Sequence, residues 1–383
     1  MIDFMVEMLF WLLLGVLIYT FFGYPLLCLL LGRFRNRLVR WDESYQPPVT
    51  LVISAYNEET VIGKKIDNTM ELDYPRERLE VIVASDGSTD RTNEIVREKI
   101  APGAPVKLLA FQENRGKTTV QNDAVMEAEG EIVVFSDANA MYQQDALGKL
   151  VRNFADREVG CVCGELVYLA GESAAGQGEG LYWRYEQFLK KVESRLGSVL
   201  GATGAIYAVR KDLYVPLDVE IISDFVEPLR IVEGGHRAVY EEEAVAYEQI
   251  DDDYGSGWKR KIRIIARGYQ GLLSVKHLMN PFRYGFLALG LISHRLLRWY
   301  AGFLLPGVLG FNAYLAWAGP ALYLWLLLIH VCFYFLAAAG MISGVKWKPL
   351  MVPAYFCAMN LASVLGVVQY YRGRRYVSWE PVR

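Results

Sequence analysis

Several features that would point to a function class are scarce in this sequence. Five cysteines occur in 383 residues, none with the spacing of a zinc site, and the four histidines show no metal-ligand spacing. The 40 basic residues are outweighed by 43 acidic ones, so no basic excess indicates a nucleic-acid partner. No internal repeat or low-complexity tract is evident. We therefore expect reduced, structural thiols, as in a cytoplasmic domain.

Hydrophobic residues, by contrast, make up 53% of the chain and are concentrated at its two ends. Residues 4–31 are almost wholly apolar and lack a basic leader and a small-residue cleavage site, which predicts a transmembrane helix and not a signal peptide. Arginines at positions 33, 35, 37 and 40 place the end of this helix on the cytoplasmic side. Residues 300–318 and 321–343, joined by a Gly-Pro turn, predict two more membrane segments.

Two segments beside these runs have two interpretations each. If residues 349–371 span the membrane, the arginines that follow lie outside, against the positive-inside tendency, so we favour a re-entrant or interfacial segment. Residues 280–299 place apolar residues at helical spacing with arginine and histidine between them, which predicts an amphipathic helix on the inner leaflet. The alternative is the start of an ordinary transmembrane helix. The expected division is 1–41 for the first helix and basic linker, 42–275 for the central domain, 276–299 for the interface helix and 300–383 for the C-terminal membrane region.

The central region alternates short strands with helices. The β-rich runs are residues 49–54, 79–84, 106–110 and 131–135. A helical stretch at 91–100 follows the second run, with Thr89 or Asp90 as its cap. Strands that alternate with helices predict an α/β fold with a doubly wound, mostly parallel sheet.

Polar motifs follow the predicted strands. They are Asn57-Glu58-Glu59, Asp86-Gly87-Ser88, Asp137-Ala138-Asn139 and, further along, Ser223-Asp224. Each motif alone is most simply a turn or a helix cap. In a parallel sheet, however, ligands bind beyond the carboxyl ends of the strands, where these motifs fall. Carboxylates collected along that edge suit a nucleotide, a divalent metal and a general base.

The order and spacing of these motifs resemble the family 2 glycosyltransferases, whose nucleotide-sugar-binding domain has the Rossmann-like GT-A fold. The matching pieces are residues 50–59, 84–90, 114–117, 135–139, 201–210 and 223–225. Residues 293–299 are similar to membrane-bound members that make exopolysaccharide or cell-envelope glycans. The resemblance implies a cytoplasmic GT-A domain flanked by transmembrane and interfacial helices.

The resemblance places the donor nucleotide at the first strand ends. It assigns nucleotide contacts to Ala55, Tyr56, Glu58 and Asp86. Tyr56 can stack on a pyrimidine, and the two carboxylates can accept hydrogen bonds from base and ribose. Lys117 can meet the diphosphate as a point charge, and the alternative is a solvated surface lysine.

A metal site is implied at residues 137–139, which correspond to the Asp-x-Asp of the family. Asp137 is expected to contact both the nucleotide and Mg²⁺ or Mn²⁺, which prefer hard oxygen ligands. Asn139 replaces the second aspartate of the family motif; an amide oxygen still ligates, but with less charge. Which of the two residues touches the metal stays open.

Asp224 matches the catalytic base of the family, which takes the proton of the acceptor hydroxyl as it attacks the anomeric carbon. The alternative is a helix cap for residues 225–233. Glu227, one helical turn away, is expected to face solvent. The acidic runs 241–243 and 251–253 are expected to be solvated as well.

Basic and glycine-rich segments complete the implied site. Arg260, Arg263 and Arg267 are expected to bind the diphosphate, and the alternative is a basic helix on anionic lipid. Processive members carry Gln-x-x-Arg-Trp at 260–264; the glutamine and tryptophan are absent here, which weakens the case for a polymerase. The acceptor is expected at a glycine-rich loop through Gly201, Thr203, Gly204 and Tyr207.

The leading hypothesis is a membrane-bound, metal-dependent, inverting glycosyltransferase (a hexosyltransferase) of the bacterial inner membrane. It would move one sugar from a nucleotide diphosphate sugar, with UDP expected, to a lipid-linked or polysaccharide acceptor at the cytoplasmic face. One alternative is a processive polysaccharide synthase of the same fold, and another is a non-catalytic nucleotide-sensing membrane protein. Trp379 is expected at the membrane interface. Donor sugar, acceptor, linkage and oligomeric state stay open.

Overall fold

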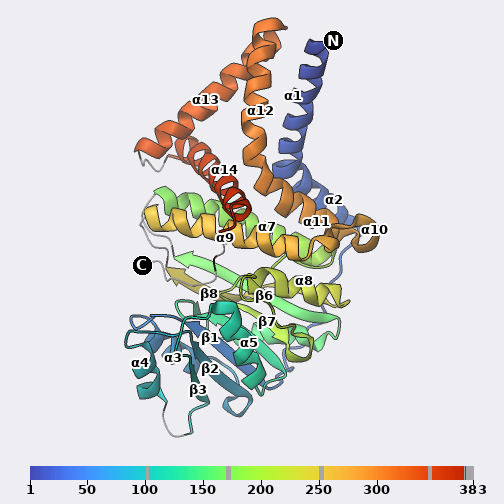
Figure 1. The fold of residues 1–383 in the computed structure, drawn as a ribbon. Coiled ribbons are helices and arrows are strands. Elements are labelled where there is room, and N and C mark those ends of the chain that lie inside the picture. The colour runs from blue at the N-terminus through green and yellow to red at the C-terminus, as the bar shows by residue number, and fades with distance from the viewer. Residues whose placement is uncertain (101–102, 170–173, 250–253, 344–346, 375, 377–383) are drawn as a thin grey trace.

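A computed structural model describes residues 1–100, 103–169, 174–249, 254–343, 347–374 and 376. The acidic run at 251–253, Arg375 and Trp379 lie outside the described residues. Figure 1 shows an α/β region at one end of the molecule, long helices at the other, and two helices lying across the middle.

One sheet forms the frame of the α/β region. Its strands run in the order β3-β2-β1-β4-β7-β6-β8-β5. Their bounds are β1 (Val49–Ala55), β2 (Leu79–Ser85), β3 (Val106–Ala110), β4 (Ile132–Asp137), β5 (Met141–Tyr142), β6 (Val159–Leu169), β7 (Tyr207–Arg210) and β8 (Arg237–Gln249). The pairs β3-β2, β2-β1, β1-β4 and β6-β8 are parallel, whereas β7 and β5 pair antiparallel with their neighbours. The predicted α/β fold and all four predicted strands are confirmed.

The sheet has a hydrophobic core on each face because its strands alternate side chains from face to face. Leu51 and Ile53 belong to one core cluster and Val52 to the other. Helices that cover the sheet are α3 (Ile62–Met70), α4 (Thr92–Lys99), α5 (Lys117–Glu127), α6 (Ala146–Val151) and α8 (Ser223–Glu233). Asp90 accepts a hydrogen bond from the backbone N–H of Thr92 at 3.0 Å, but the N-cap position of α4 is Arg91 and no side chain caps it, so the predicted cap at Thr89 or Asp90 is wrong.

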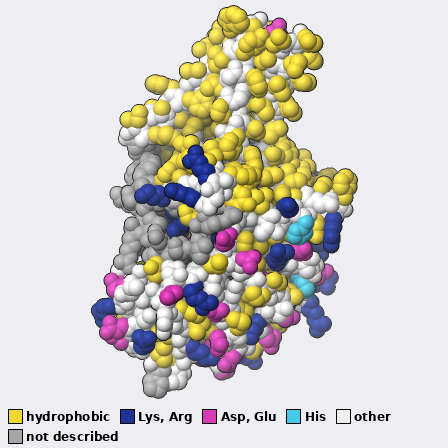
Figure 2. Space-filling model, viewed as in Figure 1, with side chains coloured by type: hydrophobic (Ala, Val, Ile, Leu, Met, Phe, Trp, Pro, Cys, Tyr) yellow, Lys and Arg dark blue, Asp and Glu magenta, His cyan; other side chains and the backbone are white. Residues whose placement is uncertain are grey.

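Among the residues that the structure describes, four helices are long and apolar enough to cross a membrane, by length and composition. The first is α1 (Ile2–Ile18), which continues through a π-helical turn into α2 (Tyr24–Phe34). The second is α11 (Phe286–Gly290), which continues through another π-helical turn (Leu291–Leu296) into α12 (Leu297–Ala318). The third and fourth are α13 (Ala321–Ser343) and α14 (Lys348–Tyr371). Figure 2 shows hydrophobic side chains covering the visible face of the end of the molecule that these helices form.

Two further helices, α7 (Ala174–Leu196) and α9 (Tyr254–Ser274), lie between the sheet and the membrane helices (Figure 1). α14 packs on α9, where the hydroxyls of Tyr371 and Tyr269 are 2.8 Å apart. In Figure 1, α14 runs from the end of α13 toward α9 and does not return to the end where α12 and α13 meet. Because Lys348–Tyr371 is also long and apolar enough to cross a membrane, the interfacial or re-entrant interpretation of residues 349–371 stays a prediction.

Two residues expected at the surface are buried instead. His294 is only 1% exposed and bonds to Glu193 and Glu186 of α7, so this part of the segment 280–299 meets protein, whereas Arg283 is exposed. Residues 286–318 form one continuous helical run, which favours the alternative of an ordinary transmembrane helix. Glu241, expected to be solvated, lies in β8 and pairs with Arg152 at 3.0 Å. The solvated-run prediction is therefore wrong for Glu241, and the interface-helix assignment of residues 276–299 stays a prediction.

Candidate active site

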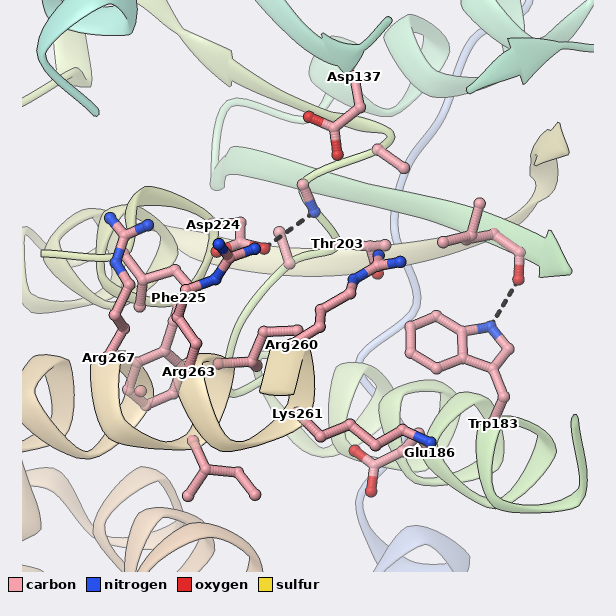
Figure 3. A pocket seen from close by; sticks show the side chains of 18 of the residues that line it. Asp137, Trp183, Glu186, Thr203, Asp224, Phe225, Arg260, Lys261, Arg263 and Arg267 are labelled. Atoms are coloured by element: carbon pink, nitrogen blue, oxygen red, sulfur yellow. Dashed lines mark hydrogen bonds between the residues drawn. The ribbon is translucent and has the colours of Figure 1, made fainter. Parts of the chain in front are cut away.

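A cavity of about 410 Å³ lies between the sheet and the helices α7, α9, α12 and α14. It brings together eight of the residues that the sequence singles out: Lys117, Asp137, Thr203, Gly204, Asp224, Arg260, Arg263 and Arg267. Figure 3 shows Asp137 on one side of this cavity and Glu186 of α7 on the other, with Asp224 and the arginines of α9 between them.

Asp224 lies in the first turn of α8, at the cavity wall. Its carboxylate accepts a hydrogen bond from the backbone N–H of Gly204 at 3.0 Å, which ties it to the 201–207 loop. Burial raises the pKa of Asp224, and the nearby Lys117 ammonium opposes that shift. A carboxylate with a raised pKa accepts a proton more readily than an ordinary aspartate does.

Gly204 is required by this close approach. A Cβ placed at Gly204 would lie 3.0 Å from the Asp224 carboxylate and 3.2 Å from the Lys117 ammonium. Any larger side chain therefore displaces the two charged groups that the loop brings together.

Lys117 begins α5 and forms an ion pair with the carboxylate of Asp137. The two side chains are 18% and 25% exposed, so the solvated-lysine alternative is wrong. The backbone of the preceding Gly116 has φ +87°, a left-handed conformation that glycine adopts without strain. The turn thus directs Lys117 toward the strand end that carries Asp137.

The arginines of α9 share one helical face because they are three and four residues apart. Arg260, Arg263 and Arg267 all line the cavity, and Figure 3 shows them extending from α9 toward Asp224 and the sheet. Arg267 donates to the carbonyl oxygen of Ile221 at 3.2 Å, and burial lowers its pKa while Asp224 counteracts the shift. The three side chains therefore line the cavity, although that of Arg260 is 42% exposed, and their binding of a diphosphate stays a prediction.

Most of the strands that frame this site, and the loops after them, lie in a part of the sequence that is similar to a known protein family. Residues 50–214 match the family model described as Glycosyl transferase family 2. This part of the chain is a family 2 glycosyltransferase domain. The result agrees with the resemblance carried by the sequence motifs.

Two curated relatives share part of this chain. A poly-beta-1,6-N-acetyl-D-glucosamine synthase of Staphylococcus aureus is 27% identical over 231 residues, which are 59% of this chain and 55% of that protein. A probable glycosyltransferase of Bacillus subtilis, YdaM, is 25% identical over 271 residues, 65% of this chain and 62% of that protein. The chain thus matches little more than half of each relative.

A solved structure shows the same fold. The mannosyltransferase PcManGT from Pyrobaculum calidifontis, in complex with GDP-Man and Mn²⁺, matches with a TM-score of 0.74 and 24% identity. The match covers 96% of this chain and 100% of that one, so the likeness extends beyond the glycosyltransferase domain to the helices that flank it.

Four of the residues predicted to contact the nucleotide, Ala55, Tyr56, Glu58 and Asp86, lie at neighbouring strand ends and are not among the residues that line the cavity. Ala55 ends β1, and the half-buried Tyr56 and Glu58 follow it. Asp86 is fully buried, with its two oxygens accepting backbone hydrogen bonds from Arg115 at 2.6 Å and Gly116 at 2.9 Å. Asp86 therefore holds the turn in front of Lys117, and its contact with the base stays a prediction.

The oxygen donors near Asp137 fit a hard divalent cation. Asn139 is exposed, and its amide donates to the carboxylate of Glu248 at 3.0 Å. Burial raises the pKa of Glu248, which Arg260 offsets. Within the described residues, no three His, Cys, Asp or Glu side chains converge as a metal site. Metal binding by Asp137 and Asn139 therefore stays a prediction.

The sequence did not single out Glu248 or Lys65. Lys65 is fully buried in α3 and donates to the carbonyl oxygen of Ala140 at 2.5 Å, which anchors the turn after Asp137. Burial lowers its pKa to about 7, and Asp137 counteracts the shift. No local pattern identifies either residue, because each is defined by the distant segment that it contacts.

Two predictions about individual residues are wrong. Tyr207 lies in β7, is 0% exposed and stacks on Phe135 with ring centroids 4.7 Å apart, so it belongs to the core and not to the acceptor loop. Glu227, expected in solvent, is 0% exposed, and burial raises its pKa to about 8. Thr203 and Gly204 line the cavity, whereas Gly201 is not among its lining residues.

Proposed function

We propose that this protein is a membrane-bound, metal-dependent, inverting glycosyltransferase. It transfers one hexose from a nucleotide diphosphate sugar, a UDP-sugar in our reading, to a lipid-linked or polysaccharide acceptor. The observation that carries this proposal is one cavity in which the half-buried carboxylate of Asp224 lies together with the cationic groups Lys117 and Arg263. The proposed location is the inner membrane of a bacterium, with the glycosyltransferase domain in the cytoplasm.

Each side chain has a defined task in this proposal. Asp224 accepts the proton of the acceptor hydroxyl, whose oxygen attacks the anomeric carbon on the side opposite the leaving diphosphate. Lys117, Arg263 and Arg267 bind the diphosphate and stabilise its negative charge as it departs. Asp137, Asn139 and Glu248 would hold a divalent cation, which neutralises part of the diphosphate charge when bound.

The decisive experiment measures release of nucleoside diphosphate by the protein in nanodiscs with Mn²⁺, across a panel of UDP- and GDP-sugars. Wild type is compared with Asp224→Asn and with Asp212→Asn, a matched change at an exposed aspartate outside the cavity. We expect release with one donor, lost by at least a hundredfold in Asp224→Asn and kept in Asp212→Asn. Equal release by all three proteins would refute the assignment of Asp224 as base.

A processive synthase remains a second candidate because the Staphylococcus relative is named as a polysaccharide synthase. The substitution of Ile264 for the tryptophan of processive members favours single additions. The product of the purified protein separates the two: a ladder of long homopolymer would support the synthase, and a single added sugar would support our reading.

A further inference from the structure

The cavity that contains Asp224 also has a wall made by membrane helices. Trp299 comes from α12, and Tyr355 and Met359 come from α14. Trp183 of α7 faces the same space, and Figure 3 shows its ring on the side of the cavity away from Asp137. A molecule that reaches Asp224 from this side therefore contacts apolar and aromatic side chains of helices that are long enough to enter a bilayer.

The cavity lining carries more positive charge than the donor needs. Seven lysines and arginines line it, against four aspartates and glutamates, which leaves an excess of three positive charges. A divalent cation would already balance the two negative charges of the donor diphosphate. The excess cations therefore suit a second anionic group in the same cavity.

Arg295 is placed to meet that second group. Its guanidinium lies over the ring of Phe225, the residue next to Asp224, at 5.5 Å. Its side chain is 20% exposed, and its buried Nε finds no hydrogen-bond partner among the described residues. Arg295 thus has hydrogen-bonding capacity beside the base.

Glu186 forms a long ion pair with Arg295, at 3.8 Å, and makes its hydrogen bonds to Arg298 and His294 instead. Although burial alone would raise the pKa of Glu186, Arg298, His294 and Arg295 together hold it well below its usual range. Glu186 therefore takes no hydrogen bond from Arg295, so the buried Nε of Arg295 keeps a donor for a ligand.

We infer that the acceptor is a membrane lipid that carries a phosphate or diphosphate in its head group, and that Arg295 binds this phosphate. The inference rests on the proposed function and names its acceptor class. The lipid chain lies along Trp299, Tyr355 and Met359, and a head-group hydroxyl reaches Asp224. In the transfer, the hydroxyl oxygen bonds to the anomeric carbon, the bond to the donor diphosphate breaks, its electron pair leaves with the nucleoside diphosphate, and the proton passes to Asp224. The lipid phosphate is not cleaved.

Binding tests the inference without knowledge of the sugar. The protein, in nanodiscs of neutral phosphatidylcholine with UDP and Mn²⁺, is titrated with a short-chain isoprenyl diphosphate and with the matching isoprenyl alcohol. Tryptophan fluorescence reports occupancy because Trp183 and Trp299 line the cavity. We expect the diphosphate to bind at least tenfold more tightly than the alcohol.

Variants at Arg295 identify the phosphate contact. Arg295→Gln should lower the preference for the diphosphate by about ten- to a hundredfold, and Arg295→Lys should restore part of it. Arg283→Gln, at an exposed arginine of α10 (Pro281–Tyr284), is the matched control and should keep the preference. Melting temperatures show whether each variant is folded, and the lysine variant preserves the test if the glutamine variant is not.

Several outcomes would overturn the inference. Equal affinity of the wild-type protein for the alcohol and the diphosphate would show that the cavity has no site for the lipid phosphate. Competition by phosphatidylglycerol, at the same mole fraction, would show that Arg295 binds bilayer head groups and not an acceptor.

A transfer assay separates this failure from failure of the proposed function. When isoprenyl diphosphate-linked sugars are supplied as acceptors, the labelled sugar of the donor should appear in lipid-linked products that are extracted into butanol. It should not appear in soluble oligosaccharides. Transfer to soluble oligosaccharides alone, lost in Asp224→Asn, would overturn the acceptor class while the glycosyltransferase proposal stands. Absence of both donor binding and turnover would overturn both.

Discussion

Replacement of Gly204 by alanine tests the geometry around the base. A Cβ at this position meets the Asp224 carboxylate at 3.0 Å and the Lys117 ammonium at 3.2 Å, so both groups must move by a few tenths of an ångström. A misplacement of about 1 Å at a catalytic group can cost roughly a hundredfold in rate. For this smaller shift we expect the rate of nucleoside diphosphate release to fall by about tenfold.

The fold itself should tolerate the change. Gly204 has a negative φ, so alanine fits its backbone, and loss of glycine flexibility in the unfolded chain can add about 0.4–1 kcal/mol to the free energy of unfolding. Gly204→Ala should therefore keep or slightly raise the melting temperature while it slows turnover. Activity loss with a large fall in melting temperature would point to a folding defect instead.

The control is Gly148→Ala in α6, where an added Cβ meets nothing within 4 Å. We expect turnover to stay at the wild-type level and stability to rise by up to about 1 kcal/mol, because alanine is the better helix former. Wild-type turnover by Gly204→Ala, measured beside this control at saturating donor, would refute the proposed placement of Asp224 and Lys117.

Three further predictions concern charged residues around the site. Glu248→Gln should weaken binding of Mn²⁺ by roughly tenfold, measured by titration of free Mn²⁺ with electron paramagnetic resonance; unchanged affinity would exclude Glu248 from the metal site. Glu227 has a folded pKa of about 8, so the folded state keeps a proton that the unfolded state loses near its ordinary value, and stability should fall as pH rises from about 5 to 8. Glu227→Gln should flatten this dependence in melting curves, and an identical slope in both proteins would contradict the burial of Glu227. Arg263→Lys should raise the KM for the donor by about tenfold, because a lysine cannot bind the diphosphate with two parallel hydrogen bonds, whereas Arg230→Lys outside the cavity should not.

Some features of the site follow from local sequence. The strands β1, β2, β3 and β4 are short β-rich runs, and their ends carry the motifs that contain Glu58, Asp86 and Asp137. Parallel pairing then brings these ends to one edge without further information. The arginines of α9 share a face for an equally local reason, the helical spacing of three and four residues.

Other features depend on segments that are far apart in the chain. Tyr207 and Glu227 were placed wrongly because their burial is decided by β4 and by the 214–215 backbone, and not by their neighbours in sequence. The sequence around His294 predicts a lipid-facing helix, whereas in the structure its ring bonds to Glu186 and Glu193 of α7. Asn139 differs from the family motif, and only the return of β8 supplies a carboxylate, Glu248, beside it.

The sequence by itself determined the α/β class, the apolar segments at both ends and the strand-end motifs of a family 2 glycosyltransferase, because each arises from residues that are close in the chain. The tertiary structure decided which charges are buried together, how α14 returns to α9, and that one cavity joins Asp224 to membrane helices. The physical reason is that burial and charge pairing are set by partners as far apart as Glu186 and His294, whose approach only the folded chain defines.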